Sequence, residues 1–490
     1  MRIGLLGFGT VGRGVYEIIA GREDMTVARV LCRRDLELPD AAVTHNFEDI
    51  LNDSTIDTVV EAIGGLHPAY EYVRGAILAG KNVATANKAL IATCFDELIP
   101  LARERGVFLR CTASVGGGIG WLSELERARR IETVHHVGGI MNGTCNYILD
   151  SMTRLGLGYS EALKQAQALG YAEADPTTDV EGIDTWHKLI VSANIGFGVS
   201  LDISGIPAAG ISRIGAEDVA NFSVNGLVCK LVSTADCQSG NYSAYVQPTL
   251  YPLGQPEAAV PANYNLITLE GDVSGRQSFF GQGAGRYPTA YNVVQDCVDF
   301  SQGKGFYTTP GRKVTVDNSV KLRYYVRTDR EDPWLKENTE KHWAGAVVTR
   351  GLSEKRQGPR ILSVHAPGLL LPGQQGFRPG APGLQPLCQP EGQLQARKVI
   401  LQKSSPGYRS LYGIREIFHY FFSSLMAARR CTDRTAREVA MFSFCTRILS
   451  GTSKWVGAKF QIALTPPAIS ILATSWAAEA GTVMMPMSTL

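Results

Sequence analysis

The sequence predicts an α/β protein: a Rossmann-type, doubly wound parallel sheet at the N-terminus, followed by an α+β domain. Three observations support this prediction. A glycine-rich turn joins an apolar strand to a helix at the start of the chain, strand and helix patterns alternate through residues 1–130, and the pattern changes after that point. A chain of 490 residues is long enough for two or three domains.

The first strand and the first helix flank a turn with the spacing G-x-G-x-x-G. Ile3 to Leu6 is a short apolar run that fits a buried parallel strand. Gly7 allows a tight turn, Gly9 lets the backbone approach a pyrophosphate, and Gly12 lets the helix pack on the strand. A purely structural turn is the alternative. The predicted cofactor contacts of this turn are Gly7, Phe8, Gly9, Thr10, Val11 and Gly12.

The end of the second strand, Thr26 to Cys32, is where the residue that reads the ribose is expected. Arg33 comes first and would pair with the 2′-phosphate of NADP, whereas an acidic residue would accept a hydrogen bond from the 2′-hydroxyl of NAD. Arg33 therefore favours NADP, and Asp35 keeps NAD open. A solvated charge cluster at a strand end is the alternative.

The remaining elements of the first domain lead to a lysine at a strand end. We expect a strand over Asp57 to Ile63, a helix over Pro68 to Leu78 and a strand over Asn82 to Thr85. Strand ends of such a sheet border the ligand crevice, so Lys88 lies where a cofactor or substrate would bind. A solvated surface lysine is an equally good interpretation.

A run of three glycines lies within Ala113 to Gly120. Such a run implies close backbone approach or unusual dihedral angles, and it leaves carbonyl groups able to point at an ion. A plain tight connection into the next helix is the alternative.

The pattern after residue 130 predicts longer strands and helices. Asn142 to Thr144 should cap a helix from Cys145 onward, and Ser160 is the expected N-cap of the helix that ends at Leu169. A glycine-rich loop ending at Gly285 precedes a helix over about residues 288–303, whose N-terminus would suit an anion. The other expected elements are strands over Glu132–Ile140, Asn225–Val232, Pro248–Pro252 and Asn263–Leu269, and a helix from Ile183 to about Ile195.

Ionisable residues are concentrated in one short loop and the start of the following helix. Unpaired buried charge is heavily penalised, so this concentration is typical of a site that grips a small cationic substrate and moves a proton. Asp184 and Lys188 are four residues apart and share a helix face, where an ordinary surface ion pair is the alternative. The six residues are Glu173, Asp175, Asp179, Glu181, Asp184 and Lys188.

Several of these motifs together resemble homoserine dehydrogenases over about residues 1–325. They are the glycine turn, T-A-N-K at Lys88, the segment Gly138 to Lys188, and the order G-x-G-A-G…P-T-A that includes Gly285. The resemblance implies an NADP-linked reduction of L-aspartate 4-semialdehyde to L-homoserine, in threonine, methionine and isoleucine biosynthesis. It also implies that the helix over about residues 288–303 returns the chain to the first domain, and that a homodimer forms through the central sheet, here roughly residues 130–280.

The resemblance assigns roles to particular residues. Lys188 supplies a proton to the forming alkoxide with help from Lys88, which lies between nicotinamide and substrate. Glu173 and Asp184 bind the substrate ammonium, and Asp179 supports them. Tyr171 and Thr144 complete the substrate site, and Gly285 joins the cofactor site.

A monovalent cation such as sodium is also implied by the resemblance, bound by backbone carbonyl groups of the glycine-rich loop. The matching residues are Thr112, Val115, Gly117 and Ile119. This chain has Gly120 where the family usually has proline, which puts the cation site in doubt.

Two other functions remain open from the sequence. One is another NAD(P)-dependent semialdehyde or amino-acid dehydrogenase on the same architecture, which would need a different substrate loop. The other is a catalytically silent nucleotide-binding homologue. The intact site residues count against the silent protein.

The C-terminal part has a different composition. Residues 358–490 contain 14 Lys and Arg against 5 Asp and Glu, a charge of +9, which leaves −7 for residues 1–357. Their Gly-, Pro- and Gln-rich start favours disorder, so we predict a poorly ordered tail without an assigned function. It could be a lineage-specific extension, a degenerate regulatory domain or sequence read in the wrong frame. Residues 326–357, with strands near Arg323–Arg327 and Ala344–Thr349, could be a remnant of a regulatory domain.

Composition restricts the cellular context. The ten cysteines show no C-x-x-C pair or zinc spacing, and the first strand begins at residue 3, so we expect reduced thiols, no signal peptide and a cytoplasmic location. The uncharged run Phe460 to Ala478 contains Pro466-Pro467 and many small polar residues, which argues against a membrane span. No membrane or nucleic-acid partner is expected.

Overall fold

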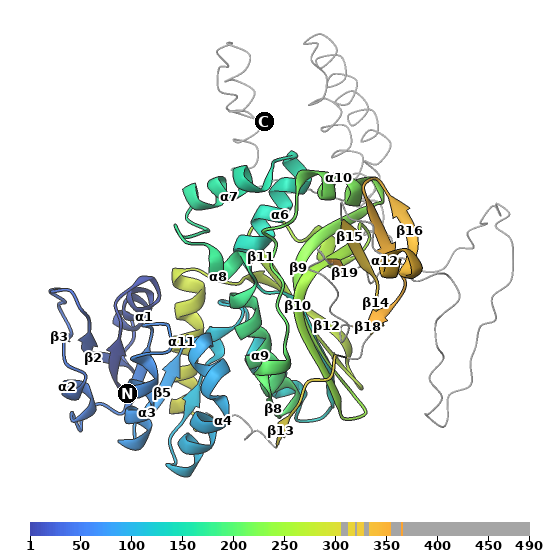
Figure 1. The fold of residues 1–490 in the computed structure, drawn as a ribbon. Coiled ribbons are helices and arrows are strands. Elements are labelled where there is room, and N and C mark those ends of the chain that lie inside the picture. Colours follow the sequence, from blue (N-terminus) through green and yellow to red (C-terminus); the bar gives the residue numbers. More distant parts are fainter. Residues whose placement is uncertain (305–311, 319–320, 328–332, 354–363, 366–490) are drawn as a thin grey trace, which may run out of the picture. The chain divides into compact units, whose positions relative to one another are not determined.

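A six-stranded sheet forms the N-terminal part of the computed structural model, which describes residues 1–304, 312–318, 321–327, 333–353 and 364–365 (Figure 1). All of its strand pairs are parallel, which confirms the predicted doubly wound sheet. From one edge to the other its strands are β3 (Ala42–Thr44), β2 (Thr26–Leu31), β1 (Arg2–Leu6), β4 (Thr58–Glu61), β5 (Asn82–Thr85) and β6 (Leu109–Arg110).

The strand order reverses between β1 and β4, so the crevice at their carboxyl ends is the expected ligand site of such a sheet. The central strands are buried on both faces, which explains why they are continuous apolar runs rather than alternating ones. The helices of this part are α1 (Thr10–Ala20), α2 (Glu48–Leu51), α3 (Ala69–Leu78), α4 (Lys88–Glu104) and, from much later in the chain, α11 (Arg286–Ser301).

Helix α11 packs against α1, as the predicted return of the chain to the first domain requires. Gly14 permits this approach, because a Cβ there would lie 2.9 Å from the carbonyl oxygen of Arg286 and 3.0 Å from the Cβ of Ala290. Arg286 also forms an ion pair with Glu17 of α1. A larger residue than glycine at position 14 would separate the two helices.

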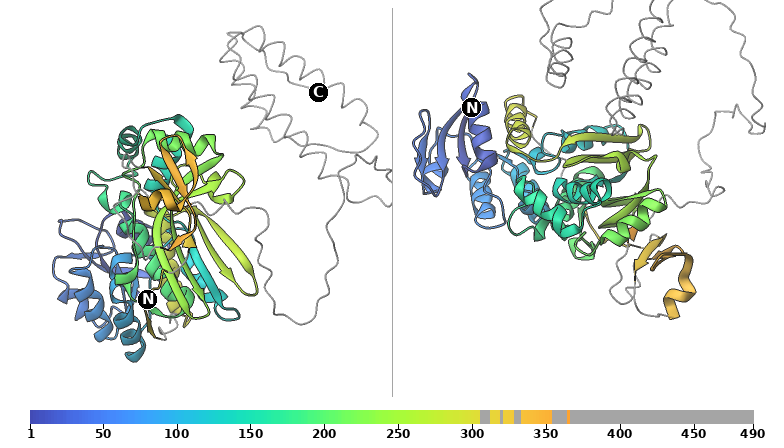
Figure 2. Two further views of the ribbon diagram at one scale, coloured as in Figure 1. Left: turned by 45° about the vertical axis from the view of Figure 1, so that its right-hand side comes forward. Right: turned by 90° about the horizontal axis from the view of Figure 1, so that it is seen from above.

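The second part of the chain is built on a nine-stranded, mostly antiparallel sheet (Figure 2). Its order is β12 (Gly275–Gln282), β11 (Tyr264–Gly271), β7 (Val134–Ile140), β9 (Leu227–Gln238), β10 (Asn241–Pro252), β19 (Val364–His365), β15 (Tyr324–Arg327), β17 (Ala346–Thr349) and β16 (Thr339–Trp343). The predicted strands are confirmed, although β9 and β10 are longer than the apolar runs that predicted them.

Helix α9 (Ile183–Phe197) lies between the two parts and positions the site (Figure 1). It packs on α4 and α5 (Trp121–Ala128) on one side, and on β7 and β9 on the other. Burial on both sides explains why its centre, Leu189 to Ala193, carries almost no charge. The remaining helices are α6 (Gly143–Leu155), α7 (Tyr159–Ala168), α8 (Thr177–Val180), α10 (Ala216–Val224) and α12 (Pro333–Asn338).

One predicted helix boundary is wrong. Helix α7 begins at Tyr159 with Gly158 as its N-cap, so Ser160 lies inside the first turn and caps nothing. Asn142, in contrast, caps α6 as predicted, because its side chain accepts a hydrogen bond from the backbone N–H of Cys145.

Short elements complete the fold. They are the 3₁₀ turns η1 (Thr112–Ser114), η2 (Ile203–Gly205) and η3 (Pro256–Ala259), and the strand pairs β8 (Ser200–Leu201) with β13 (Lys313–Val314) and β14 (Lys321–Leu322) with β18 (Leu352–Ser353).

The strands predicted near residues 323–327 and 344–349 exist, and they extend the large sheet. Tyr325 of β15 and Phe222 of α10 are in edge-to-face contact, and the Tyr325 hydroxyl donates to Asp218 at 2.8 Å. Strand β19, of two residues, lies inside the segment predicted to be a poorly ordered tail. The rest of the predicted tail, with Phe460 to Ala478, lies outside the described residues.

Within the described part of the chain, no helix has the length and apolar character needed to cross a membrane. The seven cysteines of that part are all free thiols.

Candidate active site

The turn between β1 and α1 requires glycine at two of its positions. A Cβ on Gly12 would lie 2.1 Å from the carbonyl oxygen of Gly7, and one on Gly7 would lie 2.8 Å from that of Ala62. Gly9 has open space around its Cβ position and is the N-cap of α1, whose first N–H groups receive no side-chain cap. Open space beside an uncapped helix N-terminus suits a pyrophosphate, so these residues fit a nicotinamide dinucleotide.

Two arginines lie at the end of β2. Arg33 is exposed, whereas the guanidinium of Arg34 donates to the carbonyl oxygen of Phe8 at 3.1 Å and so supports the glycine turn. The carboxylate of Asp35 accepts from His45 at 2.9 Å. The structure therefore gives Arg34 and Asp35 protein partners and leaves the Arg33 side chain in solvent.

A group of charged residues at the N-terminal end of α9, which we call the α9 cluster, consists of Lys88, Asp179, Asp184 and Lys188. Asp184 is 5% exposed and its two oxygens pair with Lys188 at 2.7 Å and Lys88 at 3.1 Å. Burial alone would raise the pKa of Asp184, but the two ammonium groups lower it well below its usual value. Asp184 also raises the pKa of Lys88. These two shifts keep Asp184 and Lys88 ionised at neutral pH.

The α9 cluster draws on elements that are far apart in the sequence. Lys188 lies one turn after Asp184 on α9, as predicted, and Lys88 is the first residue of α4. Lys188 donates a second hydrogen bond, of 2.7 Å, to the carbonyl oxygen of Met141 after β7. An ammonium has three N–H groups, so the described residues leave one of them for another acceptor.

Asn142 connects the acidic residues of the cluster. The sequence pattern predicted only that it caps a helix. Its amide nitrogen donates to Asp184 at 2.9 Å and to Asp179 at 2.7 Å, while its oxygen accepts from Cys145. Burial and the charge of Asp184 raise the pKa of Asp179. The short turn between strand and acidic loop was visible in the sequence, but nothing local indicated where the amide would point.

The other predicted substrate residues lie in the loop before α9. The hydroxyl of Thr144 donates to the carbonyl oxygen of Tyr171 at 2.6 Å, which ties this loop to α6. Glu173 is exposed, and its charge contributes to the raised pKa of Lys88. Asp175 accepts from the backbone of Thr177 at 3.1 Å instead of facing the α9 cluster. Glu181 is exposed as well.

The buried carboxylate of Glu61 holds the backbone that leads to Lys88. The sequence did not predict this role. Glu61 at the end of β4 accepts from the backbone N–H groups of Ile63 at 2.8 Å and Gly64 at 3.0 Å, and from the hydroxyl of Thr85. The side chain of Asn87 then donates to the carbonyl oxygen of Gly65 at 2.6 Å. These bonds join the ends of β4 and β5 just before Lys88.

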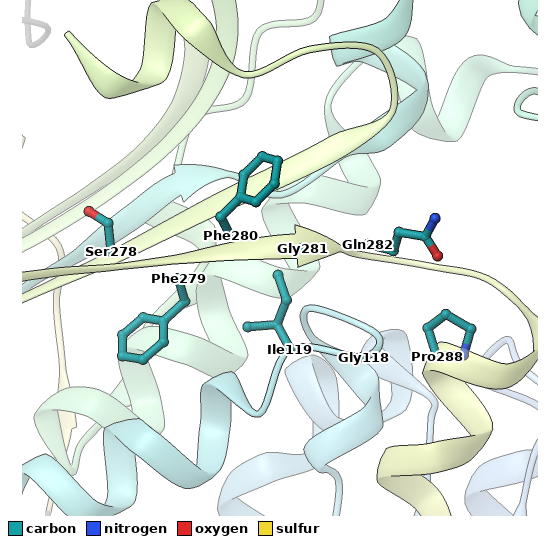
Figure 3. A pocket seen from close by; sticks show the side chains of 8 residues that line it. All are labelled: Gly118, Ile119, Ser278, Phe279, Phe280, Gly281, Gln282 and Pro288. Atoms are coloured by element: carbon teal, nitrogen blue, oxygen red, sulfur yellow. The ribbon is translucent and has the colours of Figure 1, made fainter. Parts of the chain in front are cut away.

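The glycine-rich loop lies beside β12 and the start of α11. A cavity of about 550 Å³ is lined there by Gly118, Ile119, Ser278, Phe279, Phe280, Gly281, Gln282 and Pro288 (Figure 3). The backbone N–H of Gly118 donates to the carbonyl oxygen of Gln282 at 3.2 Å. The Asn292 amide nitrogen donates to the carbonyl oxygens of Gly117 and Ile119, two of the four groups predicted to bind a cation. Gly285, the N-cap of α11, ends the loop after β12.

Comparison with known proteins agrees with this geometry. Residues 7–111 match the family model "Homoserine dehydrogenase, NAD binding domain", and residues 121–298 match "Homoserine dehydrogenase". The homoserine dehydrogenase of Bacillus subtilis is 38% identical over 312 residues, 61% of this chain and 72% of that one. That of Synechocystis is 39% identical over 315 residues, 61% and 73% of the two chains.

A solved structure is also similar. The homoserine dehydrogenase of Thiobacillus denitrificans superimposes with a TM-score of 0.68 and 30% sequence identity. The match covers 75% of this chain and 98% of that one.

Proposed function

The chain belongs to the homoserine dehydrogenase family, NAD(P)-dependent oxidoreductases that act on a CH–OH group, and on that premise we propose that it interconverts L-homoserine and L-aspartate 4-semialdehyde at the α9 cluster. The observation that supports this site best is Asp184, a buried carboxylate shared by two lysines from different parts of the chain. A bound nicotinamide cofactor supplies or accepts the hydride.

Lys188 is the proposed proton donor to the oxygen of the aldehyde as it becomes an alkoxide. Asp184 and the carbonyl oxygen of Met141 hold its ammonium through two hydrogen bonds, which leaves one N–H to face the substrate. Lys88 has a different role, because Asp184 raises its pKa and so keeps it charged. Its fixed positive charge would stabilise the developing alkoxide rather than transfer a proton.

The charge balance of the site favours a substrate with an ammonium group. Among the described residues, Lys88 and Lys188 lie near three carboxyl groups, those of Asp179, Asp184 and Glu173. If all five groups are ionised, the site has one more negative than positive charge. One oxygen of Asp184 accepts only from Lys88 within the described residues, and a carboxylate oxygen can accept twice. Glu173 and that oxygen are the proposed contacts of the substrate ammonium.

An assay with purified protein, L-homoserine and NADP tests the activity, followed through the absorbance of the reduced cofactor. Substrate-dependent reduction that other amino alcohols do not produce supports the proposal. Equal turnover of other amino alcohols would indicate a different dehydrogenase, and no turnover with either cofactor would indicate a catalytically silent homologue. Neither alternative has a feature of the described structure in its favour.

NADP is the proposed cofactor, with NAD as the alternative. Arg33 follows β2, where the residue that reads the ribose is expected in such a sheet, and its side chain is in solvent, where it can meet a 2′-phosphate. Arg33→Ala should weaken NADP binding by roughly tenfold or more and leave NAD binding unchanged. Arg34→Ala is the matched control, since Arg34 supports the glycine turn and its loss should weaken both cofactors alike. Equal losses from Arg33→Ala would refute the assignment.

The wider context follows from this reaction. We propose a role in threonine, methionine and isoleucine biosynthesis, a cytoplasmic location consistent with the free thiols, and a homodimer formed through the large sheet without membrane or nucleic-acid partners. Light scattering would test the dimer. The monovalent cation implied by the resemblance is a separate question, because Asn292 gives two of its predicted ligands another partner.

A further inference from the structure

The glycine-rich loop between η1 and α5 has a backbone conformation that favours glycine. Gly116 and Gly117 have φ angles of +81° and +52°, values that other residues rarely adopt. A Cβ on Gly117 would lie 2.6 Å from the carbonyl carbon of Gly283, so the loop is pressed against the segment after β12. Gly117 and Ile119 are buried, so their carbonyl groups require a hydrogen-bond donor or a cation, because an unpaired buried carbonyl group is costly.

A side chain of α11 meets this requirement. Asn292 is 3% exposed, and its amide nitrogen donates to the carbonyl oxygen of Gly117 at 2.5 Å and to that of Ile119 at 3.2 Å. One amide NH₂ group has two N–H bonds, so a single side chain can serve both carbonyl groups. These two carbonyl groups are half of the set that the resemblance assigns to a monovalent cation.

A carbonyl oxygen has two lone pairs, but an N–H group that donates to it carries partial positive charge and repels a cation placed against the same oxygen. A cation needs carbonyl oxygens directed at it, whereas here two of the four are directed at a donor that carries partial positive charge. The residues present therefore do not fit the cation that the resemblance implies. The disagreement concerns the identity of one side chain on α11, and it does not involve the α9 cluster.

We propose that the amide of Asn292 takes the structural place of a monovalent cation, so that this protein holds its glycine-rich loop without sodium or potassium. The amide orients Gly117 and Ile119 and links the loop to α11, as a bound ion would. The opposite orientation of the amide makes a contrary prediction. Turned by 180°, its oxygen would face the two carbonyl oxygens, and three oxygens together would require a cation.

Thermal unfolding in sodium-free buffer tests the proposal. Chloride concentration and ionic strength are held constant while choline chloride is replaced by sodium chloride, or in a second series by potassium chloride. A ligand that binds only the native state raises Tm progressively with its concentration. We expect the wild-type Tm to stay the same in all mixtures, and a saturable rise with sodium or potassium would overturn the proposal.

Two substitutions at the same position sharpen the test. Asn292→Ala removes both donors from buried carbonyl groups and should lower Tm in choline chloride by roughly 5 °C. Asn292→Asp places a carboxylate against the two carbonyl oxygens, so its Tm should rise with sodium. An Ala variant as stable as the wild type, or equal sodium responses of the wild type and the Asp variant, would each refute the role of the amide.

Asn265 provides the control for loss of a buried asparagine. It is 1% exposed on β11, and no described residue forms a hydrogen bond with either polar atom of its side-chain amide. Asn265→Ala should therefore lower Tm less than Asn292→Ala. Line broadening in ²³Na NMR gives a second measurement, with no broadening expected for the wild type. Both measurements are independent of turnover, so they can fail or succeed separately from the proposed reaction.

Discussion

The buried charges around Asp184 and those around Arg110 differ in how completely the described residues satisfy them. The α9 cluster leaves the Lys88 side chain 38% exposed and one N–H of Lys188 without an acceptor among the described residues. The second group, the Arg110 cluster, consists of Arg110 with Glu126, Asp296 and Asp299. Here the Arg110 side chain is 4% exposed and each of its three nitrogens donates a hydrogen bond.

This difference distinguishes the proposed chemical role of the α9 cluster from the structural role of the Arg110 cluster. Asp296 accepts from Arg110 at 3.1 Å and from the backbone of Thr112 at 2.9 Å, which fastens α11 to the end of β6. Burial raises the pKa of Asp296 to about 6 against the opposing effect of Arg110, so it is ionised at neutral pH. A buried cluster in which every hydrogen bond is made stabilises the fold. A partly exposed cluster with N–H groups that lack an acceptor can bind a substrate.

The largest expected effect is loss of turnover in the α9 cluster. Lys188→Ala should lower kcat by about 10² to 10⁴, the usual contribution of a general acid. NADP binding should persist, because the glycine turn does not include Lys188. Steady-state kinetics and cofactor titration measure the two effects. Lys164→Ala, at an exposed position of α7, is the control. Near-normal turnover of Lys188→Ala would mean that Lys188 does not have the proposed chemical role.

The Arg110 cluster should show the opposite response. Arg110→Met leaves Asp296 buried without its counter-charge, and breaking a buried pair typically costs about 3–5 kcal/mol of unfolding free energy. Urea unfolding measures this loss, and the protein that remains folded should keep its kcat. Arg127→Met is the matched control, since the Arg127 side chain is 75% exposed and pairs with Glu124 on the surface. A similar small loss in both variants would mean that the cluster is not structural.

Lys230, another buried cation, shows how burial lowers the pKa of a lysine. Lys230 on β9 is fully buried and donates to Asn146 at 2.8 Å and to the carbonyl oxygen of Val260 at 2.7 Å. Burial lowers its pKa to about 8. The unfolded chain therefore binds the extra proton between about pH 8 and 10.5, and stability attributable to Lys230 should rise with pH across that window.

The comparison with Lys230→Met isolates this effect. The unfolding free energy of the wild type, relative to that of Lys230→Met, should rise by about 3 kcal/mol from pH 8 to pH 10.5. Urea unfolding at several pH values measures the difference. A constant difference would mean that Lys230 keeps its normal pKa in the folded protein.

The smallest effect should come from the C-terminal extension of the large sheet. Strand β19 pairs with β10 and with β15, so a chain that ends after Ser353 loses these pairings and one that ends after residue 366 keeps them. Both chains should keep turnover and form dimers, because the α9 cluster and the glycine turn precede residue 189. The shorter chain should lose only about 1 kcal/mol of stability. Lost turnover would mean that the extension supports the site.

The sequence alone was sufficient for the features that depend on neighbouring residues. The glycine turn, the strands of the parallel sheet and the pairing of Asp184 with Lys188 follow from periodicity and spacing, which act over a few residues. The sequence also assigned Lys88, Asp184 and Lys188 to one predicted site, and the structure brings these three side chains together. The sequence predicted too many acidic residues in the site, because Asp175 and Glu181 lie apart from the α9 cluster.

Only the tertiary structure decided which distant residues meet. Asn142 joins Asp179 to Asp184, Asn292 reaches the carbonyl groups of the glycine-rich loop, and Arg110 binds Asp296 across 186 positions of the chain. Such contacts depend on how α9 and α11 pack against the two sheets, and that packing results from many apolar contacts rather than from any local pattern. An asparagine in the sequence is therefore a possible cap, ligand or donor, and the fold selects the role.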